Sequence, residues 1–256
     1  LIGFKKAGIA SLIMNIVAYW FSDKIALLIA HAKPVERRQN PELYNIVENL
    51  SIAAGLPIPK LYIINELQIN AFATGRNPKN SAVAVTAGAL QKLSRTELEG
   101  VLAHELSHIG NRDILVSTIA VVLSGVIAMV SDIFLRMMFW SNNDRRAGPI
   151  VLIMAIVAAI LAPFAAVLLR LAVSRKREFL ADASGVLLTR YPEGLASALE
   201  KIRQDSNLMR SASDATAHLY ISSPFRGKER ASWFVRLFMT HPPLEERIKI
   251  LRGMRI

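Results

Sequence analysis

The sequence has no cysteine among its 256 residues. No disulfide framework can therefore stabilise the fold, and no thiolate is available to bind a metal ion. If the protein binds zinc, the ligands must be histidine nitrogens and carboxylate oxygens. A zinc site in this chain is thus limited to two kinds of side chain.

Charged residues are also scarce, at 20% of the chain against 52% hydrophobic residues, and the mean hydropathy is +0.33. A soluble domain of this size needs less apolar sequence, so we expect segments that cross a membrane. Residues 150–169 carry no charge, and about 20 helical residues span the roughly 30 Å hydrocarbon layer. They predict a transmembrane helix with a kink at Pro163.

A second uncharged run, residues 114–131, lies before the first, and the linker between them, residues 141–149, is short and polar. The two runs predict a transmembrane helical hairpin over residues 114–173, with both outer ends on one side of the membrane. Residues 1–30 predict a further span, with an interfacial anchor of three aromatic residues. A buried helix of a soluble domain is the alternative for this shorter stretch.

The formal net charge of +11 could indicate nucleic-acid binding. However, many positive residues lie beside the predicted spans, where anionic lipid headgroups attract them: Lys33, Arg37, Arg38, Arg175, Lys176 and Arg177. The sequence also lacks the interleaved aromatic residues of nucleic-acid-binding modules. We therefore expect a lipid bilayer and no nucleic acid among the partners, and the positive-inside bias places the polar segments in the cytoplasm.

The two polar segments, residues 31–113 and 174–256, have the pattern of one globular domain interrupted by the hairpin. The sequence predicts helices from Pro41 to Gly55, from Ser94 toward Gly110, and near 174–190, 193–204 and 243–252, and short strands in LYII, NAFAT and SAVAVT, with a turn at Gly75, Asn77 and Pro78. The stretch between the last two helices is rich in serine, glycine and charge, which is typical of a mobile loop. The expected fold class is mainly α with a small β-sheet, in an integral membrane protein.

The stretch VLAHELSHIGNRD carries two histidines four residues apart. Ser94 and Glu97 before it form an S-x-x-E capping box, which predicts the start of a helix. On a helix, His104 and His108 lie one above the other and can reach one metal ion. Glu105 points to the same side but is offset, a position that suits a base for water beside the metal and not a ligand. The alternative is an ordinary helix with two solvated histidines.

A two-histidine zinc site needs a third protein ligand. A metzincin would have glycine and histidine where this chain has Asn111 and Ile114, so that family is excluded. After the hairpin, Glu178 and Asp182 lie four residues apart; Glu178 suits the third ligand, and Asp182 suits an acceptor for the outer N–H of a ligand histidine. The alternatives are a salt-bridged helix face for both acids and His218 as a rival third ligand.

Four motifs in this order resemble the HtpX family of membrane-bound zinc endopeptidases, gluzincins related to the prenyl-protein-processing metalloproteases: Asn70-Ala-Phe-Ala73, His104-Glu-Leu-Ser-His108, Arg-Glu178-Phe-Leu-Ala-Asp182 and Thr240-His241-Pro-Pro243. The resemblance covers essentially the whole chain, although the hydrophobic segment usual at the family's N-terminus is expected to be missing. It implies a zincin-like metalloprotease domain with one Zn²⁺ per chain, held by His104, His108 and Glu178, and with Glu105 as the base.

The resemblance also implies roles that the residues alone do not indicate. An edge strand that can pair with a peptide substrate is implied for Asn70, Ala71, Phe72 and Ala73. His241 and Arg247 are implied to lie near the metal and to stabilise the tetrahedral intermediate. We therefore expect a zinc endopeptidase that hydrolyses membrane or misfolded proteins in protein quality control, at the inner membrane with its active site facing the cytoplasm. The alternative is a catalytically silent membrane scaffold stabilised by zinc.

Overall fold

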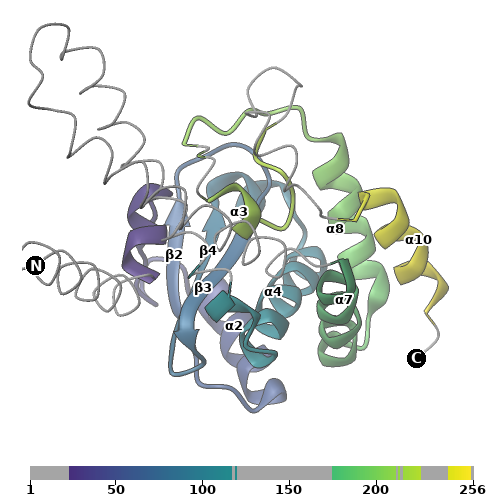
Figure 1. Cartoon of the computed structure of the whole chain (residues 1–256), viewed down its shortest axis with the longest axis horizontal. Helices are drawn as coiled ribbons and strands as arrows, with labels where there is room; N and C mark the ends of the chain where they lie inside the picture. Colours follow the sequence, from purple (N-terminus) through teal and green to yellow (C-terminus); the bar gives the residue numbers. More distant parts are fainter. Residues whose placement is uncertain are drawn as a thin grey trace, which may run out of the picture.

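A computed structural model gives the fold (Figure 1) and describes residues 23–116, 119, 175–211, 213, 216–225 and 242–254. Its elements are β1 (Lys33–Pro34), α2 (Pro41–Ala54), β2 (Lys60–Ile64), β3 (Ala71–Asn77), β4 (Asn80–Thr86), α3 (Ala87–Lys92), α4 (Arg95–Gly110), α7 (Arg175–Thr189), α8 (Pro192–Gln204), η1 (Ala217–Leu219) and α10 (Leu244–Gly253). The described part is a mixed α/β fold with one small sheet.

Within these ranges, no helix is both long enough and apolar enough to cross a membrane. The predicted hairpin, residues 114–173, lies outside the described residues except for 114–116 and 119, and so does most of the predicted span 1–30. The hairpin therefore stays a prediction. At the borders of these regions, Ile114 is buried in the main core, and Ala26 and Ala30 are buried in a second cluster beside the sheet.

The four strands form one sheet in the order β1-β2-β4-β3. β2 runs parallel to β4, and β3 pairs with β4 as an antiparallel hairpin. Gly75, which was expected in the turn, lies inside β3 with φ of 139°, where a side chain would be strained. The turn itself is formed by Pro78 and Lys79. This topology leaves β3 at an edge of the sheet, where its outer side is available to other parts of the molecule.

Helix α4 lies at the centre of the fold, between β3 and the helices α2, α7 and α8 (Figure 1). It begins as predicted: the Ser94 side chain accepts a hydrogen bond from the N–H of Glu97, and the Glu97 carboxylate accepts one from the N–H of Ser94. The close approach of α8 requires Gly100, because a Cβ there would lie 2.6 Å from the backbone nitrogen of Leu195. All residues from Gly100 to Ser107 are buried, so the side chains of His104 and Glu105 are enclosed by protein.

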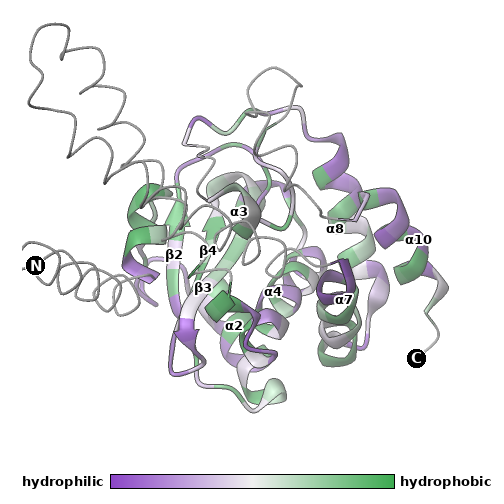
Figure 2. Ribbon diagram, viewed as in Figure 1, coloured by the Kyte–Doolittle hydropathy of each residue, from purple (hydrophilic) through white to green (hydrophobic). Residues whose placement is uncertain are grey.

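The outer helices cover α4 with amphipathic faces. Figure 2 shows both hydrophilic and hydrophobic residues around α8 and α10. The hydrophobic residues of α8 that join the main core are Leu195, Ala196, Ala198, Leu199 and Ile202. This packing fixes α7 and α8 against α4, and thereby fixes the positions of the side chains that α7 directs toward it.

The described parts of the stretch after α8, for which the composition predicts a mobile loop, contain buried residues. Met209, Tyr220 and Ile221 in its described parts are buried. The Asp205 carboxylate at its start accepts a hydrogen bond of 2.6 Å from the N–H of Ile69. A few apolar residues and one buried acid therefore hold the described parts of this stretch against the sheet. The composition, rich in serine and charge, does not indicate these contacts.

Candidate metal centre

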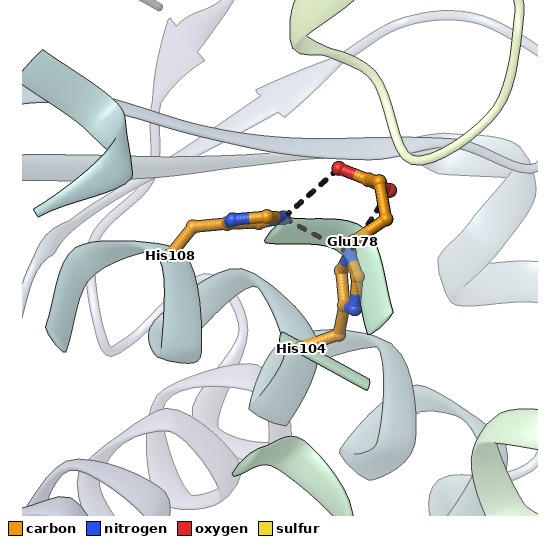
Figure 3. A group of neighbouring side chains, drawn as sticks. All are labelled: His104, His108 and Glu178. Carbon is orange, nitrogen blue, oxygen red and sulfur yellow. Dashed lines mark hydrogen bonds and ion pairs between the residues drawn. The ribbon is translucent and has the colours of Figure 1, made fainter. Parts of the chain in front are cut away.

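Two helices bring three potential metal ligands together. α4 presents His104 and His108, and α7 presents Glu178, so that one ligand atom from each residue lies within 4.8 Å of the others. Figure 3 shows the three side chains pointing toward one another. The Nε2 atoms of the histidines are 3.1 Å apart, and the Glu178 carboxylate lies 3.6 Å from that of His108 and 3.9 Å from that of His104. The residues predicted as ligands thus form one cluster.

The outer nitrogens of both rings face carboxylates. Nδ1 of His104 lies 2.9 Å from Asp182 Oδ1, and Nδ1 of His108 lies 3.1 Å from Asp113 Oδ2. Because a carboxylate only accepts hydrogen bonds, each neutral ring carries its proton on Nδ1 and directs a lone pair from Nε2 toward the other ring. Two facing lone pairs beside the Glu178 carboxylate repel one another unless a cation lies between them.

The spacing of these donors fits zinc. Bonds of about 2.1 Å in a tetrahedron separate the ligand atoms by about 3.4 Å. Here the two Nε2 atoms are 3.1 Å apart, and each lies near a different oxygen of Glu178, Oε1 at 3.6 Å from His108 and Oε2 at 3.9 Å from His104. A proton competes for the same place. Burial lowers the pKa of His108, but the hydrogen bond to Asp113 and the charge of Glu178 outweigh it and raise that pKa. Metal binding at this cluster is therefore expected to release protons.

A buried arginine completes the surroundings of His104. Arg247 on α10 is fully buried and makes two hydrogen bonds to the Asp182 carboxylate, 2.8 Å from Nε and 2.6 Å from Nη2. Its Nη1 lies 3.5 Å from Glu178 Oε2. Burial alone would raise the pKa of Asp182, but Arg247 and His104 lower it to about 2. Asp182 is therefore ionised and suited to hold His104 in the tautomer that metal binding needs.

Glu105 lies next to the three potential ligands. It is buried on α4, and its carboxylate accepts a hydrogen bond from the N–H of Ala73 on the edge strand β3. Burial raises its pKa to about 7, and the neighbouring charge of Glu178 acts in the same direction. A carboxyl group with a pKa near neutrality can both accept and return a proton at physiological pH.

Asp113 is the residue of this cluster that the sequence analysis did not single out. It is buried, and besides the contact with His108 its Oδ1 lies 3.1 Å from Nε of Arg177. Five residues after His108, an acid on an uninterrupted helix would point elsewhere. The chain turns instead at Arg112, which has φ of 60°. The sequence predicts that the helix ends near Gly110, but it does not predict the left-handed conformation at Arg112 that directs Asp113 back to His108.

The structure describes the side chains of some of the remaining predicted site residues but not of others. Asn70 directly precedes β3, and Ala71 to Ala73 begin it; all four are buried, and the N–H of Ala73 donates to Glu105. Arg247 lies at the cluster but is engaged by Asp182 and Glu178. His241 lies outside the described residues, and for His218 only the backbone, within η1, is described. The proposed role of His241 and the rival role of His218 therefore stay predictions.

In metal-assisted peptide hydrolysis, a Lewis acid and a base act on the same water molecule; here three potential metal ligands and the buried carboxyl of Glu105 lie close together. Together with the fold and the comparisons with known proteins, this cluster defines the class of the protein, a metalloprotease. The sequence profile of peptidase family M48 matches residues 37–255. The chain belongs to that family.

Individual relatives agree with this assignment. The protein called "Protease HtpX homolog" from Caldanaerobacter subterraneus subsp. tengcongensis is 48% identical over 249 residues, covering 94% of this chain and 81% of its own length. The proteins of the same name from Syntrophobacter fumaroxidans and Pyrococcus furiosus are 47% and 49% identical, over 98% and 94% of this chain and 90% and 83% of their own lengths. The resemblance stated from the four motifs is thereby confirmed.

A solved structure supports the fold at lower identity. The crystal structure of S. mikatae Ste24p superposes with a TM-score of 0.54 and 18% identity, covering 97% of this chain. The chain spans only 58% of that protein's length. At this identity, the likeness bears on the fold alone.

Proposed function

We propose that the protein is a membrane-anchored, zinc-dependent endopeptidase that hydrolyses membrane or misfolded proteins. The observation that carries this proposal is the buried Glu105 carboxyl beside the convergent side chains of His104, His108 and Glu178. One Zn²⁺ per chain fits the three donors, which contain only nitrogen and oxygen. Bound there, zinc supplies a Lewis acid that polarises the scissile carbonyl and makes water easier to deprotonate.

The protein residues then divide the remaining work. Glu105 takes a proton from the attacking water and passes it to the leaving amine, a transfer that a carboxylate within hydrogen-bond reach of both can make. Asp182 and Asp113 keep the ring nitrogens of His104 and His108 oriented toward the metal position. Arg247 supports this arrangement through Asp182 and Glu178. His241 is proposed to help stabilise the oxyanion.

The edge strand supplies a place for the substrate. Main-chain groups on the outer side of β3 can pair with an extended peptide, and the sequence of the peptide matters little to such bonds. This fits a protease that acts on unfolded chains of varied sequence. The stretch proposed to bind substrate is Asn70, Ala71, Phe72 and Ala73.

The proposed location is the inner membrane, with the active site facing the cytoplasm. Its support lies in the uncharged runs 114–131 and 150–169 and in the positive residues that flank them. The catalytic domain, residues 31–113 and 174–256, would then be interrupted by the hairpin 114–173. Proximity to the bilayer favours membrane proteins and their flanking segments as substrates.

A comparison of two glutamate variants on the same helix tests the proposal. The full chain, purified in detergent and loaded with zinc, should cleave casein, and a chelator should stop the cleavage. Glu105→Gln should retain zinc but lose at least about a hundredfold in activity. Glu99→Gln, a change at a partly exposed side chain of α4, should leave both unchanged. If the zinc-loaded wild type cleaves nothing, the catalytically silent scaffold is favoured; equal activity of Glu105→Gln and wild type contradicts the assigned base.

A further inference from the structure

The outer side of β3 is already partly occupied by the chain itself. Asn70 and the even-numbered residues that follow it bond toward β4, as the bond from Thr86 N–H to the Asn70 carbonyl illustrates. Ala71 and Ala73 therefore direct their main-chain groups outward. The Ala73 N–H donates to Glu105, and the Ala71 carbonyl accepts a 3.0 Å hydrogen bond from the N–H of Ile221. A segment from after α8 thus lies at the edge proposed for the substrate.

This segment, Tyr220 to Ser222, is bound through its main chain. The Asn70 amide accepts a hydrogen bond from the Ser222 N–H at 3.4 Å and donates one to the Ser222 carbonyl at 3.0 Å. Arg247 Nη1 donates to the Ile221 carbonyl at 3.3 Å. Both main-chain polar groups of two consecutive residues are therefore held by groups at the edge of the site, as those of a bound peptide would be.

The segment runs antiparallel to β3 and ends beside the metal cluster. Ile221 lies opposite Ala71 and Ser222 opposite Asn70, so its residue numbers rise as those of β3 fall. The nitrogen of Arg247 that holds the Ile221 carbonyl also pairs with Glu178. A substrate that ran antiparallel to β3 with its scissile bond beside Glu105 would place the residues after that bond where Ile221 and Ser222 lie.

We infer that the Tyr220–Ser222 segment is an autoinhibitory peptide mimic, which occupies the subsites for the two substrate residues after the scissile bond and leaves when substrate binds. This inference rests on the proposed function. Any substrate that uses the Asn70 amide, the Ala71 carbonyl and Arg247 competes with the segment, since the Asn70 amide has no further capacity while Ser222 is bound.

The segment packs against its neighbours, but two of its side-chain hydroxyls lack hydrogen-bond partners. Tyr220 packs edge-on against Phe72, with ring centroids 5.0 Å apart, and Ile221 is buried in the main core. Among the residues that the structure describes, however, Tyr220 Oη and Ser222 Oγ are buried and have no hydrogen-bond partner. Burying an unpaired hydroxyl is unfavourable. These unpaired hydroxyls make the seated position of residues 220–222 less stable. The segment is therefore easier to displace than a fully satisfied one would be.

Two opposite changes at Ser222 test the inference with fluorescein-labelled casein. Ser222→Pro removes the N–H that donates a hydrogen bond to the Asn70 amide. Because the segment is then held less tightly, kcat/KM should rise about threefold to tenfold through a lower KM. Ser222→Ala keeps the N–H but removes the unpaired hydroxyl, so it should lower kcat/KM by a similar factor. Ser51→Ala removes a comparable buried hydroxyl from α2 and should leave KM unchanged. Unchanged or reversed effects at Ser222 would overturn the inference.

Hydrogen exchange supplies a readout that does not depend on turnover. In the zinc-loaded Glu105→Gln chain, saturating unlabelled casein should increase exchange at the amides of residues 220–222; protection that stays the same or rises overturns the inference. Its failure is distinguishable from failure of the proposed function. Cleavage by wild type without any gain in Ser222→Pro counts against autoinhibition alone, whereas loss of the function would appear as no cleavage by either protein.

Discussion

Asp113 Oδ2 lies 3.1 Å from Nδ1 of His108, while Oδ1 of the same carboxylate lies 3.1 Å from Arg177. Asp113 directly precedes the predicted hairpin and Arg177 follows it. One buried acid therefore links a candidate metal ligand to both ends of the interrupting segment. Through this contact, the orientation of His108 depends on how the two halves of the domain meet.

Replacing Asp113 should therefore weaken metal binding. Asp113→Ala leaves the His108 ring without its acceptor, and loss of such a partner lowers metal affinity by about 10- to 100-fold. Competition between the purified protein and a zinc chelator of known affinity measures the change. Glu99→Ala, at a partly exposed side chain of α4, serves as the control. Equal zinc affinity of Asp113→Ala and wild type would show that Asp113 does not orient the ligand.

The pair formed by Arg247 and Asp182 should behave as a coupled unit. Asp182→Ala leaves the fully buried guanidinium of Arg247 without its main partner, which is expected to destabilise the metal-free protein by about 3–5 kcal/mol. The double variant Asp182→Leu/Arg247→Met should lose less stability than the sum of the losses caused by Asp182→Leu and Arg247→Met alone. Urea unfolding of the single and double variants measures this coupling, and strictly additive losses would contradict it.

Local sequence signals predicted most elements well. Helix α4 runs from Arg95 to Gly110 and is preceded by the expected capping box at Ser94. Helix α2 begins at Pro41 and ends before Gly55, where a left-handed residue closes the helix as glycine allows. These boundaries depend on side chains within a few residues, so a single sequence suffices to predict them.

Contacts between distant segments were harder to predict. Glu178 and Asp182 were recognisable because four-residue spacing places both on one face of α7. Asp113 was not, because its position depends on the turn at Arg112. Nothing in the strand patterns predicts that β2 pairs with β4, or that Ile221 bonds to Ala71, since both depend on how the whole chain packs.

Asp205 gives the protein a predictable dependence on pH. Burial raises the pKa of its carboxyl, but hydrogen bonds from the N–H of Ile69, the Asn207 amide and Lys92 outweigh burial and lower it. A lowered folded-state pKa adds stability above the unfolded value of about 3.9, and this stability is lost as pH falls through the folded value.

Asp205→Asn should therefore be less stable than wild type by about 1–3 kcal/mol at pH 7. The difference should shrink as pH falls below about 4, where the wild-type carboxyl becomes protonated. Urea unfolding at a series of pH values follows the change, with the exposed Glu245→Gln as the control. A difference that stays constant down to pH 3 would mean that the charge of Asp205 adds no stability.

The close contact between α7 and α4 at Gly185 should control the geometry of the metal cluster. A Cβ at Gly185 would lie 3.0 Å from the backbone nitrogen of His104, so Gly185→Ala must push the two helices apart by a few tenths of an ångström. Glu178 lies two turns earlier on α7 and would move away from both histidines. We expect zinc affinity to fall, together with a loss of about 1–3 kcal/mol in stability.

Gly110→Ala on α4 is the matched change, because its Cβ would meet only a side-chain atom of Leu56 at 3.6 Å. Alanine favours helix over glycine, so this variant should keep its zinc affinity and be as stable as wild type or slightly more so. Chelator competition and thermal unfolding of both variants separate a steric effect from a general effect of alanine. If Gly185→Ala bound zinc as tightly as Gly110→Ala, the α7–α4 contact would not set the distance between Glu178 and the two histidines.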